Sequence, residues 1–415
     1  MRFGQWWLAA CLVLPAWAWA QAAPQVLTLA QALQVARENV DVSLARRALA
    51  SARADVVAAD HAPIPVVIAK ASQLDLANGI GSGSVLGSKR IDKSLGVDWT
   101  YERGNKRELR TRAAEGVAGA AQHDVADVVV QQQIAVASAY FDLLAAQERV
   151  EQVGAMERGA AELAGASQRR QRAGDISLQE SLRTEIEARR AQTELRGAQA
   201  DRQRAALTLA QLLGLQGELQ VEPAWPPLVA EQPGLPDIEQ RADVLAARRR
   251  VEAAQAAFDA AAALRRNDLT LGASLDHFPG TSSRLLELRV SVPLGGMLGA
   301  YGYDGEIARA RATLDSTQDQ LEKVRRQARA ESGRLAEDLR SAAARAAEFE
   351  QAIVPRARQV AGMAELAYSR GALPLVDLLD ARRTLRSVLL DDLAARADFA
   401  RASTAWQLRQ QPPTP

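Results

Sequence analysis

Two carboxylates three residues apart are the clearest candidates for chemistry in this sequence of 415 residues. Asp377 and Asp380 lie near the start of a predicted helix over residues 374–410, and residues at this spacing share one helix face. Like charges held this close repel each other, so the pair favours a cation nearby. The simpler interpretation is that acidic residues in a first helical turn favour the helix dipole.

The other chemically active residue types form no recognisable site. His61, His123 and His277 fall on unrelated predicted elements and have no ligand spacing to one another. The sequence has no phosphate-binding glycine loop, nucleophile elbow or zinc-protease motif, and we expect no cofactor. A net charge of +1 and an aromatic content of 4% argue against a nucleic-acid partner.

The first 20 residues read as a signal peptide. Arg2 precedes an apolar stretch, and Ala18-Trp19-Ala20 matches the small-x-small cleavage pattern. An alternative is that Leu8-Ala9-Ala10-Cys11 is a lipobox with a lipidated cysteine. The first interpretation leaves the mature chain without a thiol. No later stretch approaches the roughly eighteen apolar residues of a spanning helix, so insertion into a membrane would need strands.

The chain contains one internal duplication, at an interval of about 200 residues. Asp41 in the first copy aligns with Asp243 in the second, and Gly174 aligns with Gly371. The predicted organisation is a signal peptide over 1–20, a first repeat over 21–214, a proline-rich linker over 215–237, a second repeat over 238–410 and a disordered tail over 411–415.

Each repeat carries an amphipathic strand pair, in which apolar and polar residues alternate. Alternation alone also suits a half-buried strand of a soluble sandwich. However, four strands per chain cannot close a barrel, which needs about eight, so two or preferably three chains must share one. The residues expected to face lipid are Leu95, Val97, Trp99, Tyr101, Leu269, Leu271, Leu288, Val290 and Val292.

Long helices connect these strands. A helix over 27–60, with Thr28 as N-cap, precedes the first strand pair. Helices over 106–167 and 305–369 follow the two strand pairs, and sixty residues of helix span about 90 Å. The later helix contains a near-heptad seam of Leu335, Leu339, Ala342, Ala346, Phe349, Ile353, Val360, Met363 and Ala367. Each long helix ends at a glycine turn, after which a return helix begins near Ser177 or Pro374.

This layout resembles the bacterial outer-membrane efflux proteins of the TolC family. The most specific local match is the stretch Tyr368-Ser-Arg-Gly-Ala-Leu-Pro-Leu-Val-Asp-Leu-Leu-Asp-Ala381. A second stretch, Trp99-Thr-Tyr-Glu-Arg-Gly-Asn-Lys-Arg107, is similar to the heavy-metal efflux branch, although that branch has Gly-Gly-Lys-Arg at its end.

The resemblance implies a mainly α fold with a small β part: duplicated helical hairpins form an α-barrel, and three chains build a twelve-stranded barrel in outer-membrane lipid. It implies a homotrimer that works with a periplasmic adaptor and an inner-membrane pump, and it implies no enzymatic activity. It places Asp377, Asp380 and Tyr368 at a periplasmic gate. It places Gly174, Gly371, Arg172 and Arg370 at the helix-tip turns and adaptor docking site.

The resulting hypothesis is a passive efflux duct of the bacterial outer membrane that reaches into the periplasm. Its cargo could be heavy-metal cations, drugs or polypeptides, which the sequence does not distinguish. The alternatives are the outer-membrane duct of a type I protein secretion system and a non-channel coiled-coil protein of the periplasm. Alternating strands disfavour the last of these.

Overall fold

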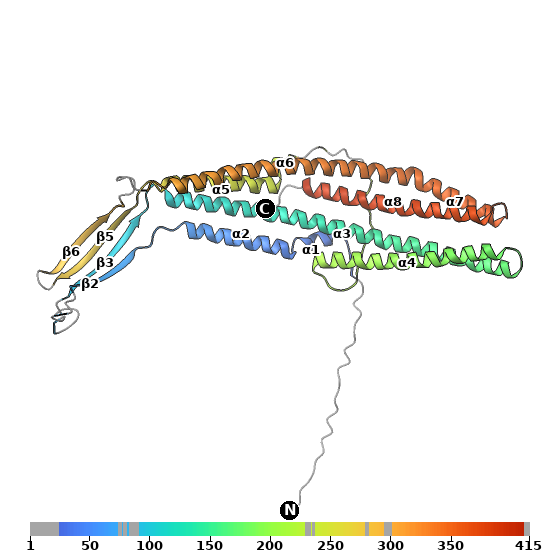
Figure 1. The fold of residues 1–415 in the computed structure, drawn as a ribbon, viewed down its shortest axis with the longest axis horizontal. Coiled ribbons are helices and arrows are strands. Elements are labelled where there is room, and N and C mark those ends of the chain that lie inside the picture. Colours follow the sequence, from blue (N-terminus) through green and yellow to red (C-terminus); the bar gives the residue numbers. More distant parts are fainter. Residues whose placement is uncertain are drawn as a thin grey trace, which may run out of the picture. The chain divides into compact units, whose positions relative to one another are not determined.

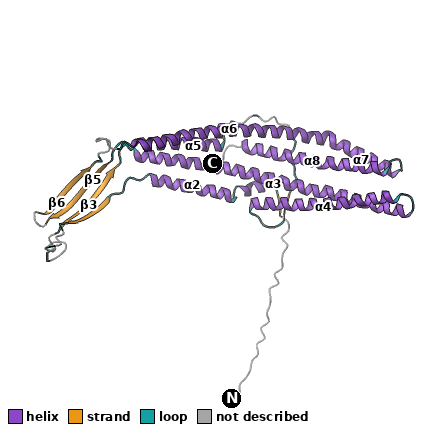
Figure 2. Ribbon diagram, viewed as in Figure 1, coloured by secondary structure: helices purple, strands orange, loops and turns teal. Residues whose placement is uncertain are grey.

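The computed structural model describes residues 25–73, 91–228, 237–278, 282–293 and 301–410, together with residues 77, 81, 82 and 234. The predicted signal peptide with Cys11 and the predicted tail lie outside the described residues. Helices dominate the described chain, and its strands are few (Figure 2). The chain divides into two units, one of Met1–Gln31 with Asp142–Ala224 and one of Ala32–Phe141 with Trp225–Pro415.

The first unit contains the end of α3 (Lys106–Arg172), α4 (Leu178–Leu213) and two short strands. Strand β1 (Gln25–Leu27) pairs in parallel with β4 (Leu219–Val221), and both ends of β4 are buried. The side chain of Gln147 donates to the carbonyl of Val221 at 3.1 Å and accepts from its N–H at 2.9 Å. The stretch predicted as a linker therefore contains a strand that is held to a helix.

The predicted helix over 27–60 is two helices, α1 (Leu29–Ala36) and α2 (Val40–Ala59). Thr28 caps α1 as expected, because its hydroxyl accepts from the N–H of Gln31 and its own N–H donates to the Gln31 side chain. The break was not predicted. It falls at Asn39, whose side chain accepts from the N–H of Asp41 and starts a new helix.

The second unit contains a four-stranded antiparallel sheet in the order β2-β3-β5-β6 (Figure 1). Its strands are β2 (Val66–Ser72), β3 (Asp92–Tyr101), β5 (Leu269–Phe278) and β6 (Ser282–Ser291). The predicted strand pairs are confirmed, and the two pairs join through β3 and β5. The register sets Trp99 opposite Leu271 and Ala273 opposite Leu288, so the predicted apolar residues share one face.

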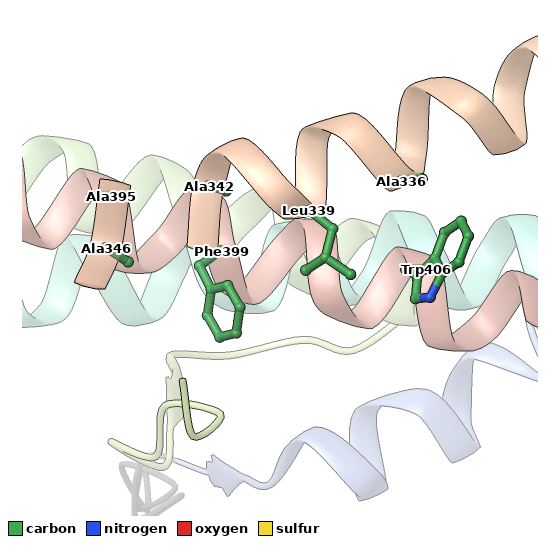
Figure 3. Close-up of a cluster of buried hydrophobic side chains, with 7 residues drawn as sticks. All are labelled: Ala336, Leu339, Ala342, Ala346, Ala395, Phe399 and Trp406. Atoms are coloured by element: carbon green, nitrogen blue, oxygen red, sulfur yellow. The ribbon is translucent and has the colours of Figure 1, made fainter. Parts of the chain in front are cut away.

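The helices of this unit pack through small residues. They include α5 (Ala242–Ala263), α6 (Asp304–Glu348), α7 (Val354–Ser369) and α8 (Leu375–Gln410). Figure 3 shows Phe399 and Trp406 of α8 among the alanines and Leu339 of α6. Alanine lets the two backbones approach closely, and the two aromatic rings fill the remaining space.

The predicted seam is confirmed in α6 and wrong in α7. Leu339, Ala342 and Ala346 are buried, but Val360 and Met363 are 48% and 57% exposed. A π-helical turn, Phe349–Ile353, separates the two helices just before Pro355. Such a turn inserts one residue into the helical repeat, so every later position moves by one. The buried positions of α7 are accordingly Val354, Ala357, Ala361 and Ala364.

Equivalent places in the two repeats carry different polar networks. In the second repeat, the buried Arg241 pairs with Asp243 at 2.8 Å and with Glu331 at 2.6 Å. Glu331 also pairs with Arg409, which reaches Asp127 at 2.7 Å. In the first repeat, the corresponding bonds are neutral or singly charged: Asn39 donates to Gln132, and Gln132 donates to Asp41. We call the charged set the Arg241 network.

Helix α3 is more apolar than the sequence led us to expect. Helix α3 contains an 18-residue window with a mean hydropathy of 1.3, of which 44% is buried. By length and composition alone it could cross a membrane. The buried helices at the centre of a packed protein have the same composition, so this helix does not by itself define a span.

Candidate functional sites

One face of the sheet is apolar and exposed. Leu95 is 61% exposed, Leu288 is 76% exposed and Val290 is 66% exposed, and Trp99 and Tyr101 contact each other edge to face. Eight of the nine residues predicted to face lipid lie on this side of the sheet, with Leu269 half-buried at the start of β5, and Val292 follows the end of β6. Their lipid contact remains a prediction.

The opposite face of the sheet is polar. Arg289 on β6 pairs with Asp98 on β3 at 2.8 Å, and the buried Asp276 accepts from the hydroxyl of Ser274 at 3.1 Å. Strand β5 lies between β3 and β6, and Gly272 is the residue of β5 beneath the ion pair. A Cβ atom at Gly272 would collide with the Asp98 carboxylate. A strand with one apolar and one charged face suits a wall between lipid and water.

Ion pairs join the sheet to the helices. Lys106 at the start of α3 pairs with Asp268 at 2.8 Å, and the backbone N–H of Arg103 donates to the same carboxylate. Arg110 pairs with Glu102 at 3.1 Å. Sequence reasoning missed these pairs, although acidic residues at the strand ends were a usable signal. They fix the direction in which the helices leave the strands.

The two glycine turns have the same geometry. Gly174 has a φ of 86° and Gly371 has a φ of 74°. In each turn, the glycine N–H donates to the carbonyl three residues earlier, and the next N–H donates to the carbonyl five residues earlier. This is the Schellman ending of a helix. No atom crowds the missing Cβ in either case, so the positive φ is what requires glycine.

The carboxylates of Asp377 and Asp380 lie on the exposed face of the first turns of α8. Leu375 and Leu378 occupy the buried face. Within the residues that the structure describes, neither carboxylate is paired with a basic side chain. The sequence placed them on one helix face, and the structure agrees.

The first repeat has a different arrangement at the equivalent position. Glu180, which aligns with Asp377, forms a capping box with Ser177, with both hydrogen bonds at 3.2 Å. In the second repeat, Pro374 stands where Ser177 would be, and proline has no side-chain oxygen to cap a helix. Glu180 is therefore used by its own helix, whereas Asp377 projects freely.

The remaining predicted site residues lie at the same turns. Tyr368 is half-buried, and its carbonyl accepts from the N–H of Gly371 at 3.0 Å. Arg172 and Arg370 are exposed at the ends of α3 and α7. In the described ranges, no three histidine, cysteine or acidic side chains gather into a metal site. The roles of Tyr368 in gating and of the arginines in docking remain predictions.

Known proteins are similar to this chain in sequence and in fold. A family model described as outer membrane efflux protein matches residues 29–215. The chain is 27% identical over 317 residues to the cobalt-zinc-cadmium resistance protein CzcC of Cupriavidus metallidurans, covering 73% of each chain.

Solved structures share the fold. The outer membrane protein VceC of Vibrio cholerae aligns with a TM-score of 0.75 at 20% identity, over 92% of this chain and 96% of VceC. The CmeC outer membrane channel of Campylobacter jejuni aligns with a TM-score of 0.75 at 15% identity, over 92% of this chain and 85% of CmeC. At such identities the likeness establishes the fold alone.

A four-stranded sheet with one exposed apolar face, together with long helical hairpins, is the fold that this chain shares with these outer-membrane proteins. The chain is thus similar to outer membrane efflux proteins, in sequence over residues 29–215 and in fold over most of its length, and its place is the bacterial outer membrane.

Proposed function

We propose that the chain is one of three identical subunits of a passive efflux duct. The observation that carries this proposal is the open sheet. Strands β2 and β6 are its two edges, and the face that holds Leu95 and Leu288 is apolar and exposed. A closed membrane barrel needs about eight strands at least, and unpaired edges do not persist in lipid. Three copies supply twelve strands and leave no edge.

The helices extend the duct into the periplasm in this proposal. The turns at Gly174 and Gly371, with the exposed Arg172 and Arg370, supply contacts for a periplasmic adaptor. The duct carries out no chemical reaction, and an inner-membrane pump provides the energy of transport.

We propose that divalent metal cations are the cargo. The name of CzcC states resistance to cobalt, zinc and cadmium, and this chain is similar to it over most of its length. The unpaired carboxylates of Asp377 and Asp380 add support. In a trimer they would form two rings of three negative charges, which attract cations electrostatically without binding them tightly.

The test is a deletion strain complemented with plasmid-borne variants. Loss of the chain should lower the zinc, cobalt and cadmium concentrations that stop growth, and the intact gene should restore them. A variant without residues 1–20 is the matched control, because it retains the whole duct but lacks the export signal. Unchanged metal tolerance with reduced drug tolerance or reduced protein secretion would contradict the proposed cargo.

A further inference from the structure

The apolar face of the sheet carries basic residues at the end farther from the helices. Side chains on one face alternate along each strand, so Lys93 lies on the same face as Leu95 and Val97. His277 lies on the same face as Leu275, and the register sets it opposite Lys93. Arg284 on β6 lies two residues before Leu286, which is opposite Leu275, at the point where the register of β5 with β6 shifts between Asp276 and Phe278. Three adjacent strands thus end in three basic residues at one level.

The other end of the same face is aromatic. Trp99 and Tyr101 of β3 lie next to the junction with the helices and are 41% and 53% exposed. Eight residues separate Lys93 from Tyr101, which is about 26 Å along a strand. With the usual strand tilt this approaches the roughly 25 Å apolar band of a membrane barrel. The basic residues therefore lie at the depth of one layer of lipid headgroups.

Lys93 has no anionic partner among the residues that the structure describes. Its Nζ atom is shielded from solvent and makes no hydrogen bond within the described part of the chain. A cation without a partner is costly away from water, and a neighbouring anion removes that cost. A phosphate accepts hydrogen bonds from lysine, arginine and imidazole alike.

We propose that Lys93, His277 and Arg284 form a binding row for the phosphate of an anionic lipid headgroup. The row lies at the loop end of the sheet and therefore takes a lipid of the leaflet farther from the periplasm. This inference rests on the proposed function, because it requires the apolar face to lie in a membrane.

Lipid selectivity measured by electron spin resonance tests the row. The full mature chain is reconstituted into phosphatidylcholine bilayers with trace spin-labelled phosphatidic acid or spin-labelled phosphatidylcholine. The fraction of each label that the protein immobilises is then compared. We expect the intact chain to prefer phosphatidic acid by about fivefold or more, since each basic residue near a lipid surface contributes about that factor.

Variants distinguish phosphate binding by this row from a general attraction of anionic lipid to basic side chains. Lys93→Gln combined with Arg284→Gln should reduce the preference to near one. The matched control is Lys70→Gln, because Lys70 pairs with Ser94 at the same level and projects from the polar face. It should keep the full preference. Equal total immobilised lipid in all variants shows that each one has inserted.

Three outcomes would overturn the binding row alone. The intact chain could immobilise lipid without preferring phosphatidic acid, or the double variant could keep the preference. The third outcome is that Lys70→Gln loses the preference as fully as the double variant does. A different result bears on the proposed function. If the intact chain immobilises neither label, the sheet does not contact lipid, and both the duct and the row are wrong.

Discussion

The Asp98 carboxylate on β3 and the Arg289 guanidinium on β6 lie 2.8 Å apart, although β5 separates their strands. Gly272 leaves room for this pair, because a Cβ atom there would collide with the Asp98 carboxylate and crowd the Arg289 guanidinium. The pair links the first repeat to the far edge of the second across the polar face. It is a local reason why β3 and β5 join the two repeats into one sheet.

Replacing Gly272 by valine should therefore loosen the sheet. The valine side chain would displace Asp98 from Arg289 and separate the two charges. We expect the assembled protein to dissociate at a lower temperature on semi-native electrophoresis. Ala273→Val is the control, because it places the same valine side chain at the neighbouring residue on the apolar face. Equal dissociation temperatures for both variants would show that the pair has no structural role.

The freely projecting carboxylates of α8 should control cation block. Replacing Asp377 and Asp380 by alanine removes the proposed charge rings, so divalent cations should block single-channel current in planar bilayers less strongly. Glu180→Gln is the matched control. It removes the aligned carboxylate of the first repeat, and glutamine can still complete the capping box with Ser177. If divalent cations block the aspartate variant as strongly as the intact channel, Asp377 and Asp380 do not lie at the periplasmic gate.

The Arg241 network should be more sensitive to mutation than the hydrogen bonds of Asn39, Gln132 and Asp41 at the equivalent place in the first repeat. Arg241→Met leaves Asp243 and Glu331 without their shared partner in a largely buried setting, which should cost about 3 kcal/mol of unfolding free energy. Asn39→Ala removes one neutral hydrogen bond at the equivalent place and should cost about 1 kcal/mol. Denaturant unfolding followed by helical circular dichroism gives both values. A smaller loss in the arginine variant would contradict this ranking.

The buried carboxyl of Asp392 should make the stability of the folded protein depend on pH. Burial raises the pKa of its carboxyl, opposed by Arg396 at 3.0 Å and by Arg358, while Glu350 reinforces the shift. A carboxyl whose pKa is higher in the folded state favours folding when protonated. The carboxyl of Asp392 therefore does not destabilise the fold at pH values below 3.8, its ordinary pKa. The destabilisation grows as the pH rises from 3.8 to the shifted pKa and stays constant above it.

Asp392→Asn should accordingly stabilise the protein at neutral pH. The gain should shrink as pH falls toward 3.8 and then disappear. Asp391→Asn is the control, since the neighbouring Asp391 is exposed on the same helix. Thermal melting at several pH values measures the difference. A gain that does not depend on pH would show that burial of the charged carboxylate is not the cause.

Local patterns in the sequence predicted much of this fold. Alternation placed Leu95 and Val290 on one face, and equivalent glycines marked both turns, because side-chain period and positive φ are properties of single segments. The pairing of β3 with β5 and the ion pair over Gly272 were not predicted. They join residues far apart in the chain, and no local pattern records which strands meet.

The errors in the helices have the same origin. A heptad pattern continued correctly through Ala346 and then failed at Val360, because the π-helical turn shifts the repeat by one residue. Pro355 suggested a disturbance but not its size. At the candidate gate, the sequence gives the spacing of Asp377 and Asp380 but not their exposure, which depends on how α8 packs against α7.

Cysteine crosslinking between the two edge strands tests the shared barrel most directly. Cys11 is the only cysteine and precedes the predicted cleavage site, so the mature chain offers a thiol-free background. A cysteine at Val67 on β2 would be combined in turn with cysteines along β6, from Leu286 to Val290, and oxidised in isolated outer membranes. The account predicts that at least one combination yields crosslinked dimers and trimers and nothing larger. A ladder that ends at the monomer for every combination, or that continues beyond three chains, would contradict it.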